Sequence, residues 1–294
     1  MIYSVFPMTA KPGDKVKAIT KDKDIEGILM PNEETDSVVI KLENGYNIGI
    51  KKEKLKKIEI IEKYKEKKFS KEKQFGHDKK KKTIFILHTG GTIASKVDYK
   101  TGGVIARFTP EELISMFPEL KKIANIDSWL IENMWSEDMR FKLYSIIAKD
   151  IKKSIDKGAV GIIITHGTDT LHYTSAALSF ILENLSIPVI LVGAQKSSDR
   201  GSSDAGMNLL CAAEFIAKTD FTGVAICMHE NMDDDNCLIM PACKTRKLHS
   251  SRRDAFKTVN DSPIARINYK SKKIDIIKKD SPKKSDKKLL IKDR

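Results

Sequence analysis

Two short segments rich in glycine and threonine carry the residue types that could do chemistry in this sequence. The first, TGGTIAS at residues 89–95, follows the apolar run 84–87, and the second, THGTDT at residues 165–170, follows the apolar run 159–164. Glycine lets the backbone turn sharply and approach a ligand, while the threonines add hydroxyl groups to the same turns. Neither segment matches G-x-G-x-x-G or G-x-x-x-x-G-K-[ST], so we assign no nucleotide site. Alone, either segment would be an ordinary connection between a strand and a helix.

The two segments together suggest paired hydroxyl groups across one crevice. A threonine hydroxyl is a weak nucleophile until a base removes its proton. The second segment adds a carboxylate, Asp169. Ligands in open α/β sheets bind beyond the carboxyl ends of the strands, where both segments would lie. The base must come from elsewhere in the chain, and a lysine that is desolvated and paired with Asp169 is a physical candidate.

The elements that would position these segments alternate between strands and helices from residue 83 onward. Short apolar runs predict strands at 83–87, 159–164, 188–192 and 224–228. Capping residues and apolar residues at helical spacing predict helices that begin at 109 and that span 141–155, 170–185 and 204–218. Such alternation builds βαβ units, so the predicted fold class is α/β, with a doubly wound and mostly parallel sheet at residues 83–275.

The first 61 residues have a different pattern. They contain several short strand-like runs separated by tight turns, and Asn44-Gly45 is a strong hairpin signal. Such a pattern predicts a small all-β barrel module, closed so that no long strand edge is exposed. The module holds no evident catalytic residue, so we interpret it as a docking or nucleic-acid-facing module. Residues 62–82 form a lysine-rich linker to the α/β domain.

The net charge of +13 lies in the linker and in residues 270–294, because basic and acidic residues balance in the rest of the chain. Two interpretations of these segments remain open: solvated, weakly ordered sequence, or electrostatic attraction to a polyanion such as tRNA.

The four cysteines have the spacing of neither a disulfide framework nor a C-x-x-C zinc site. No apolar stretch approaches the roughly 18–20 residues of a membrane helix, and the N-terminus does not read as a signal peptide. These patterns predict a reduced cytoplasmic protein.

Taken in order, TGGTIAS and THGTDT resemble the two signatures of the bacterial-type asparaginase family, and the resemblance extends from about residue 83 to 275. It implies hydrolysis of the side-chain amide of asparagine or glutamine, with no metal and no cofactor held by this chain. Carried over by position, Thr92 resembles the nucleophile that attacks the amide carbon. Thr168, Asp169 and Lys247 resemble a second triad in which the lysine is the base. Tyr99 is similar to a tyrosine of a mobile lid that helps to activate the nucleophile.

The resemblance also implies substrate-binding residues. Ser136 matches a serine that holds the substrate α-carboxylate, and Glu137 takes the neighbouring substrate-binding position. Backbone N–H groups near Thr92 and Ala194 would form an oxyanion hole, where each donor is typically worth ~2.7–4 kcal/mol. Gly91 and Ala194 are accordingly the remaining substrate-binding candidates.

The N-terminal module and the run GAQKSSDRGSSDA at residues 193–205 resemble one branch of the family, the GatD subunits of archaeal glutamyl-tRNA(Gln) amidotransferases. That branch implies a glutaminase whose ammonia is used by a partner protein, GatE. The partner phosphorylates Glu-tRNA(Gln) with ATP and Mg²⁺ before the ammonia completes Gln-tRNA(Gln). A homodimer is also implied by the family.

Two alternatives remain open. One is a free-standing L-asparaginase, and the other is a truncated, non-catalytic remnant that binds tRNA or a partner. Family members continue into a second α/β domain, whereas residues 276–294 read as a short basic tail. We therefore expect this chain to lack that domain, with consequences for dimerisation and for substrate affinity.

Overall fold

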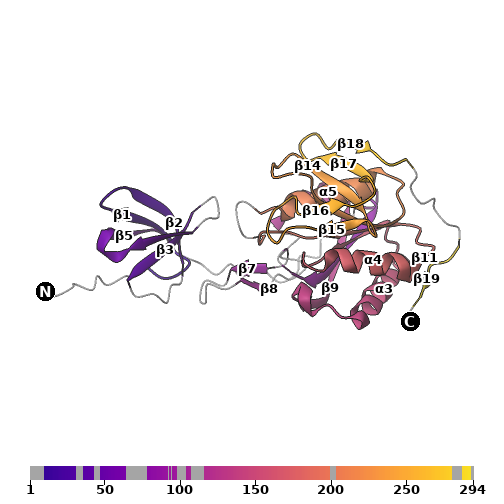
Figure 1. Ribbon diagram of the computed structural model, residues 1–294, viewed down its shortest axis with the longest axis horizontal. Helices are drawn as coiled ribbons and strands as arrows, with labels where there is room; N and C mark the ends of the chain where they lie inside the picture. Colours follow the sequence, from indigo (N-terminus) through magenta and orange to yellow (C-terminus); the bar gives the residue numbers. More distant parts are fainter. Residues whose placement is uncertain are drawn as a thin grey trace. The chain divides into compact units, whose positions relative to one another are not determined.

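The computed structural model describes residues 10–30, 36–42, 47–63, 78–91, 93, 95–97, 104–106, 116–198, 203–279 and 287–292. These residues form two compact units, a smaller one of residues 10–63 together with 97 and 104–105, and a larger one of the remaining described residues (Figure 1). The predicted hairpin turn at Asn44-Gly45 and the predicted helix start at residue 109 lie outside the described residues. No helix in the described part of the chain is long and apolar enough to cross a membrane.

The N-terminal unit is a curved five-stranded antiparallel sheet with the order β4-β3-β2-β1-β5. Its strands are β1 (Lys15–Thr20), β2 (Asp24–Met30), β3 (Ser37–Lys41), β4 (Asn47–Lys51) and β5 (Leu55–Glu62), with a 3₁₀ turn, η1 (Lys52–Lys54), before the last. Alternate residues of β1 are buried, as the period of a strand requires. Val16 and Ala18 of this strand pack with Leu29, Val38 and Ile40 into a separate apolar core.

The larger unit is built on an eight-stranded sheet with the order β18-β17-β14-β13-β12-β10-β6-β9. Its parallel strands are β6 (Thr83–Gly90), β9 (Asn125–Met134), β10 (Gly161–Thr165), β12 (Pro188–Val192) and β13 (Gly223–His229). Three antiparallel strands extend the sheet beyond β13, namely β14 (Asn236–Pro241), β17 (Ala265–Asn268) and β18 (Ile274–Ile276). The predicted α/β fold with a mostly parallel sheet is confirmed.

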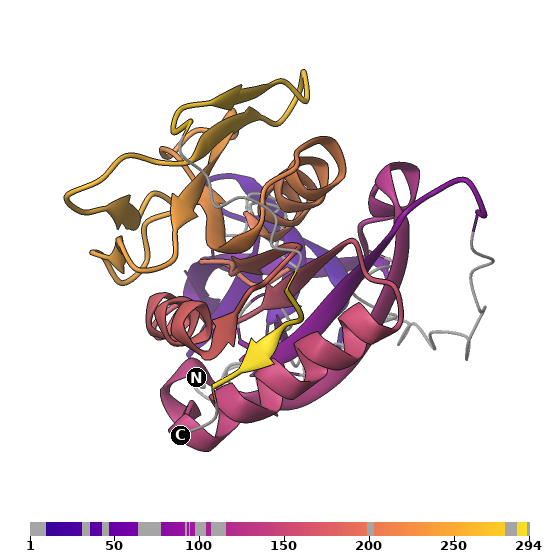
Figure 2. The same cartoon turned by 90° about the vertical axis from the view of Figure 1, so that its right-hand side faces the viewer.

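Helices cover both faces of this sheet (Figure 2). Helices α3 (Phe141–Asp156) and α4 (Leu171–Ile181) pack on one face, while α2 (Leu120–Ile123) and α5 (Ala205–Lys218) pack on the other. Strand β6 shows why both faces need cover, because its successive side chains point to opposite faces. Ile84 and Ile86 join the core beneath α5, whereas Phe85 and Leu87 join the core beneath α3 and α4.

Helix α4 ends four residues before the predicted limit of residue 185. The next two residues form a short strand, β11 (Leu182–Glu183), which pairs with β19 (Leu290–Ile291) from the far end of the chain. The backbone N–H of Lys292 donates to the carbonyl oxygen of Ile181 at 2.8 Å. The helix therefore ends where the chain pairs with a strand that lies more than a hundred residues further along.

Two smaller hairpins complete the secondary structure of the described residues. Strands β7 (Ser95–Val97) and β8 (Val104–Ala106) form the first, and β15 (Thr245–Lys247) and β16 (Phe256–Thr258) form the second. The second hairpin matters for the site, because it carries Lys247 over the carboxyl ends of the parallel strands, where a 3₁₀ turn, η3 (Ser136–Asp138), also lies.

Candidate active site

Three glycines allow the loops at the carboxyl ends of β6, β9 and β10 to come into contact. Gly91 has a φ of +78°, and a Cβ on it would overlap the backbone of Gly167. A Cβ on Gly167 would lie 2.6 Å from the Cβ of Ser136. Gly90 has a φ of +96°, and its Cβ would overlap the backbone of Met134. Side chains at these positions would hold the loops apart, so the glycines place the two threonine-rich segments and Ser136 together.

Lys247 reaches the second of these segments from hairpin β15–β16. Its Nζ lies 2.7 Å from Oγ1 of Thr168 and 2.9 Å from Oδ1 of Asp169. The lysine side chain is only 6% exposed, whereas that of Asp169 is 62% exposed. The sequence alone suggested a desolvated lysine paired with Asp169, and the structure contains that pair. A buried lysine in contact with one hydroxyl group and one carboxylate is placed to exchange a proton with that hydroxyl group.

Ser136 contacts the carboxylate oxygen of Asp169 that Lys247 does not contact, and Glu137 contacts Ser136. Oγ of Ser136 is 2.9 Å from Oε2 of Glu137 and 3.3 Å from Oδ2 of Asp169. Thr170 fixes this turn, because its hydroxyl donates to the carbonyl oxygen of Ser136 at 2.6 Å. Two carboxylates so arranged could bind the ammonium group of a small zwitterion, and the Ser136 hydroxyl could turn to donate to the carboxylate of the same molecule.

The remaining predicted site residues divide into two groups. Thr92 and Tyr99 lie outside the described residues. Gly91 and Ala194 are buried at the ends of β6 and β12. The N–H of Gly91 donates to the carbonyl oxygen of Met134 at 3.0 Å, so it helps to hold the loop in place. The described residues contain no cluster of side chains suited to hold a metal ion.

Gln195 is a site residue that the sequence analysis did not assign. Its Oε1 accepts a hydrogen bond from the hydroxyl of Thr168 at 3.3 Å, and its Nε2 donates to the carbonyl oxygen of Arg252 at 2.9 Å. Its own backbone N–H donates to the buried carboxylate of Asp204 at 3.0 Å. Only its place in the run at residues 193–205 pointed to it, because nothing in the spacing links it to Thr168.

Two buried histidines brace the same loops in their neutral form. Nδ1 of His88 contacts Oγ1 of Thr165 at 2.9 Å, and the ring of His166 bridges the carbonyl oxygen of Gly167 and the hydroxyl of Thr174. Desolvation lowers the pKa of His88 to about 3. It also lowers the pKa of His166 to about 4, although the bond to Gly167 opposes it.

These low pKa values predict that acid weakens the α/β unit. Between pH 6.5 and the folded-state pKa, the unfolded chain binds a proton at each histidine and the folded chain does not, so stability falls as the pH falls. From pH 7 to pH 5 we expect a loss of about 2 kcal/mol in the free energy of unfolding for each histidine. Urea unfolding at both pH values measures it. His88→Gln should reduce the difference in the free energy of unfolding between the two pH values by about 2 kcal/mol. An unchanged difference would contradict a low pKa of His88 in the folded chain.

Comparison with known proteins places the chain in a family. A family model described as "Asparaginase, N-terminal" matches residues 83–281, and one described as "GatD N-terminal domain" matches residues 10–61. The chain belongs to the asparaginase family.

Among curated relatives, it is 47% identical to the GatD subunit of the glutamyl-tRNA(Gln) amidotransferase of Pyrococcus furiosus, over 96% of this chain and 66% of the relative. It is 46% identical to the GatD subunit of Methanococcus vannielii, over 94% of this chain and 66% of the relative. The chain thus spans about two thirds of the length of these relatives.

Solved structures show the same fold. The thermostable L-asparaginase from Thermococcus kodakarensis matches with a TM-score of 0.60 and 31% identity, over 71% of this chain and 60% of that one. L-asparaginase I from Vibrio cholerae matches with a TM-score of 0.61 and 28% identity, over 72% of this chain and 61% of that one.

Proposed function

We propose that this chain is the amide-hydrolysing subunit of a tRNA-dependent amidotransferase, acting in the cytoplasm on glutamine or asparagine. The contact of the buried Lys247 with Thr168 and Asp169 is the observation that carries the chemical part of this proposal. Identity of 47% to a GatD subunit, over both the N-terminal module and the α/β domain, supports the assignment to an amidotransferase.

The proposed mechanism has two chemical steps, attack by Thr92 and hydrolysis of the acyl enzyme. The hydroxyl oxygen of Thr92 forms a bond to the amide carbon, and the proton that it loses passes to the leaving nitrogen as the carbon–nitrogen bond breaks. Lys247, in contact with Thr168, acts as the base that moves this proton. In the second step a water molecule attacks the acyl carbon, the bond to Thr92 breaks, a proton returns to the Thr92 oxygen and the free acid leaves. Ser136, Glu137 and Asp169 hold the zwitterionic end of the substrate. This chain itself holds no cofactor in the proposed scheme.

The ammonia would pass to a partner that uses ATP and Mg²⁺ to activate Glu-tRNA(Gln). We propose that the partner corresponds to GatE of the complexes to which the relatives belong. Such coupling predicts low activity of the chain alone, because uncoupled hydrolysis would consume glutamine without amidating tRNA.

Ammonia release tests the proposal. The purified chain is assayed with glutamine and with asparagine, alone and with an archaeal GatE, ATP, Mg²⁺ and Glu-tRNA(Gln), and Thr92→Ala is the control. Release that needs the partner and that Thr92→Ala abolishes is the expected result. Release from asparagine that ignores partner and tRNA would identify a free-standing asparaginase. No release under any condition, with salt-dependent tRNA binding, would identify a non-catalytic remnant.

The contact of Gln195 with Thr168 gives a second prediction. Gln195→Leu removes both side-chain hydrogen bonds, so we expect kcat to fall about fivefold while KM changes little, as for the loss of a hydrogen bond of roughly 1 kcal/mol that orients a reacting group. Gln195→Glu keeps an acceptor for the Thr168 hydroxyl and should retain more of kcat. Steady-state kinetics separates the two constants, and an increase in KM alone would argue against an orienting role.

A further inference from the structure

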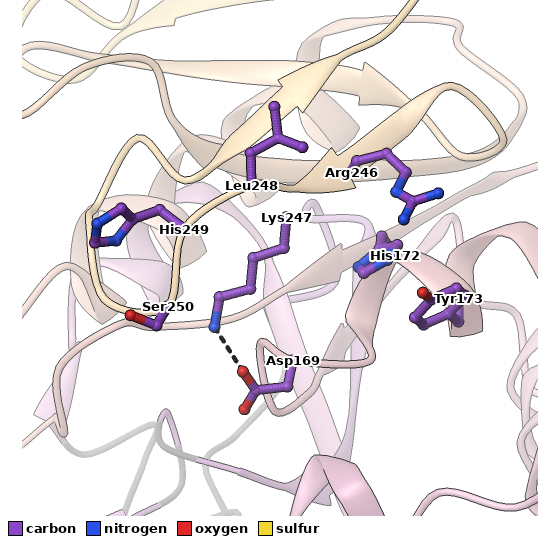
Figure 3. A pocket seen from close by; sticks show the side chains of 8 residues that line it. All are labelled: Asp169, His172, Tyr173, Arg246, Lys247, Leu248, His249 and Ser250. Atoms are coloured by element: carbon purple, nitrogen blue, oxygen red, sulfur yellow. Dashed lines mark hydrogen bonds and ion pairs between the residues drawn. The ribbon is translucent and has the colours of Figure 1, made fainter.

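An open cavity at the surface borders the Asp169–Lys247 pair (Figure 3). It has a volume of about 360 Å³ and lies between the first turn of α4 and the segment that follows β15. Its lining residues are Asp169, His172, Tyr173, Arg246, Lys247, Leu248, His249 and Ser250. It shares Asp169 and Lys247 with the candidate active site, whereas Thr168, Ser136 and Glu137 do not line it.

His172 is the first indication that this cavity takes a ligand. The residue is 7% exposed, and neither ring nitrogen has a hydrogen-bond partner among the described residues. Its ring packs against that of Tyr173, with centroids 4.0 Å apart. A buried polar group without a partner is costly, and such groups usually have one in a functional state of the protein.

Arg246 is the second indication. Its guanidinium group points toward the ring of His172 (Figure 3), and it has no hydrogen bond or ion pair within the described part of the chain. Burial, then the charges of Arg246 and Lys247, lower the pKa of His172. An exposed arginine beside a neutral imidazole therefore leaves positive potential in the cavity that nothing present neutralises.

The other polar groups of the lining also favour an anion. Nδ1 of His249 accepts the backbone N–H groups of Ser251 and Arg252 at 3.1 and 3.2 Å, so its ring proton lies on Nε2. Asp169 is the single carboxylate among the lining residues, and Lys247 already neutralises it at 2.9 Å. The lining thus offers several hydrogen-bond donors and a spare positive charge.

We propose that this cavity is an anion-binding site, in which Arg246 holds a carboxylate or phosphate group beside the ring of His172. Arginine suits both, because its planar fork of donors matches their oxygen atoms. Tyr173 and Leu248, which are 52% and 63% exposed, would contact the remainder of the ligand.

An anion bound in this cavity would affect Lys247. An anion beside Lys247 favours its protonated form and thereby weakens it as a base. We therefore infer that the bound anion lowers the rate of amide hydrolysis, a consequence that rests on the proposed function, whereas the binding itself does not.

Binding is tested directly with two probes, inorganic phosphate and glutarate. Each is titrated into the full chain at constant ionic strength, with sodium chloride as compensation, while NMR follows the ring signals of His172. Saturable shifts of these signals with at least one probe are expected, and the probe that binds more tightly identifies the anionic group. Arg246→Gln should weaken that binding at least about tenfold, as expected for a charge-assisted hydrogen bond. Lys142→Gln removes an equal charge from an exposed position on α3 and should leave it unchanged.

Two results would overturn the proposal: no saturable shift with either probe, or equal binding by the wild type and Arg246→Gln. Both variants change exposed side chains, and circular dichroism verifies that each is folded. In a separate assay, the probe that binds should inhibit ammonia release by the wild type more than by Arg246→Gln. Absence of ammonia release would contradict the proposed function, while the NMR titration would still decide whether the anion site exists.

Discussion

Replacing Lys247 by methionine is expected to lower kcat for amide hydrolysis by about 10²–10⁴-fold, the range that general acid–base groups usually contribute. Methionine has a similar length and fills the same space, so the loss isolates the amino group. That group is the one that contacts both Thr168, at 2.7 Å, and Asp169, at 2.9 Å. The measurement is partner-stimulated ammonia release at saturating glutamine.

Two further variants show what kind of role Lys247 has. Lys244→Met removes an exposed lysine three residues earlier and should leave kcat unchanged. Lys247→Arg retains the positive charge but cannot lose its proton at any accessible pH. If the arginine variant kept most of the activity, Lys247 would act as a fixed charge and the proposed base would have to be another group.

The central strands were predictable from the sequence because they are buried on both faces. Residues 161–165 and 188–192 are buried throughout, and each run is continuously apolar apart from its ends. A run of this kind between helical segments indicates a parallel strand, and its carboxyl end then indicates where ligands bind. The positions of the segments that carry Thr168 and Gly91 followed from this.

The edges of the sheet were not predictable in the same way. Strand β9 is only partly buried along its length, so its sequence, NIDSWLIENM, has no continuous apolar run. Strands β11 and β19 are two residues each and exist through pairing across more than a hundred positions. Contacts over such distances decide short elements, and local sequence does not record them.

The same contrast between local sequence signals and long-range contacts applies to the candidate site. Asp169 belongs to a segment that signals a strand end, whereas Lys247 lies 78 residues away and was found through the family resemblance. Gln195 had no signal of its own, because its role depends on the distance between its side chain and Thr168. Sequence reasoning therefore located the loops, and the structure was needed to show which side chains they bring into contact.

Gly91→Ala is expected to reduce the rate of amide hydrolysis by at least about 100-fold, the loss that a displacement of roughly 1 Å can cause at an active site. The added Cβ would overlap the backbone of Gly167, so one of the two threonine-rich segments must move away from the other. The φ of +78° adds backbone strain of about 1–2 kcal/mol for any residue with a Cβ.

Gly158→Ala separates these two effects, because Gly158 has a φ of +88° but no atom within 4 Å of a Cβ placed on it. It follows α3 and precedes the amino end of β10, so it lies at the end of that strand opposite to Thr168. Urea unfolding should show that this variant loses about 1–2 kcal/mol of stability from strain alone, with kcat unchanged. If Gly91→Ala behaved the same way, close approach of the loops would not be what the active site requires of Gly91. A loss of activity confined to Gly91→Ala would show that it is.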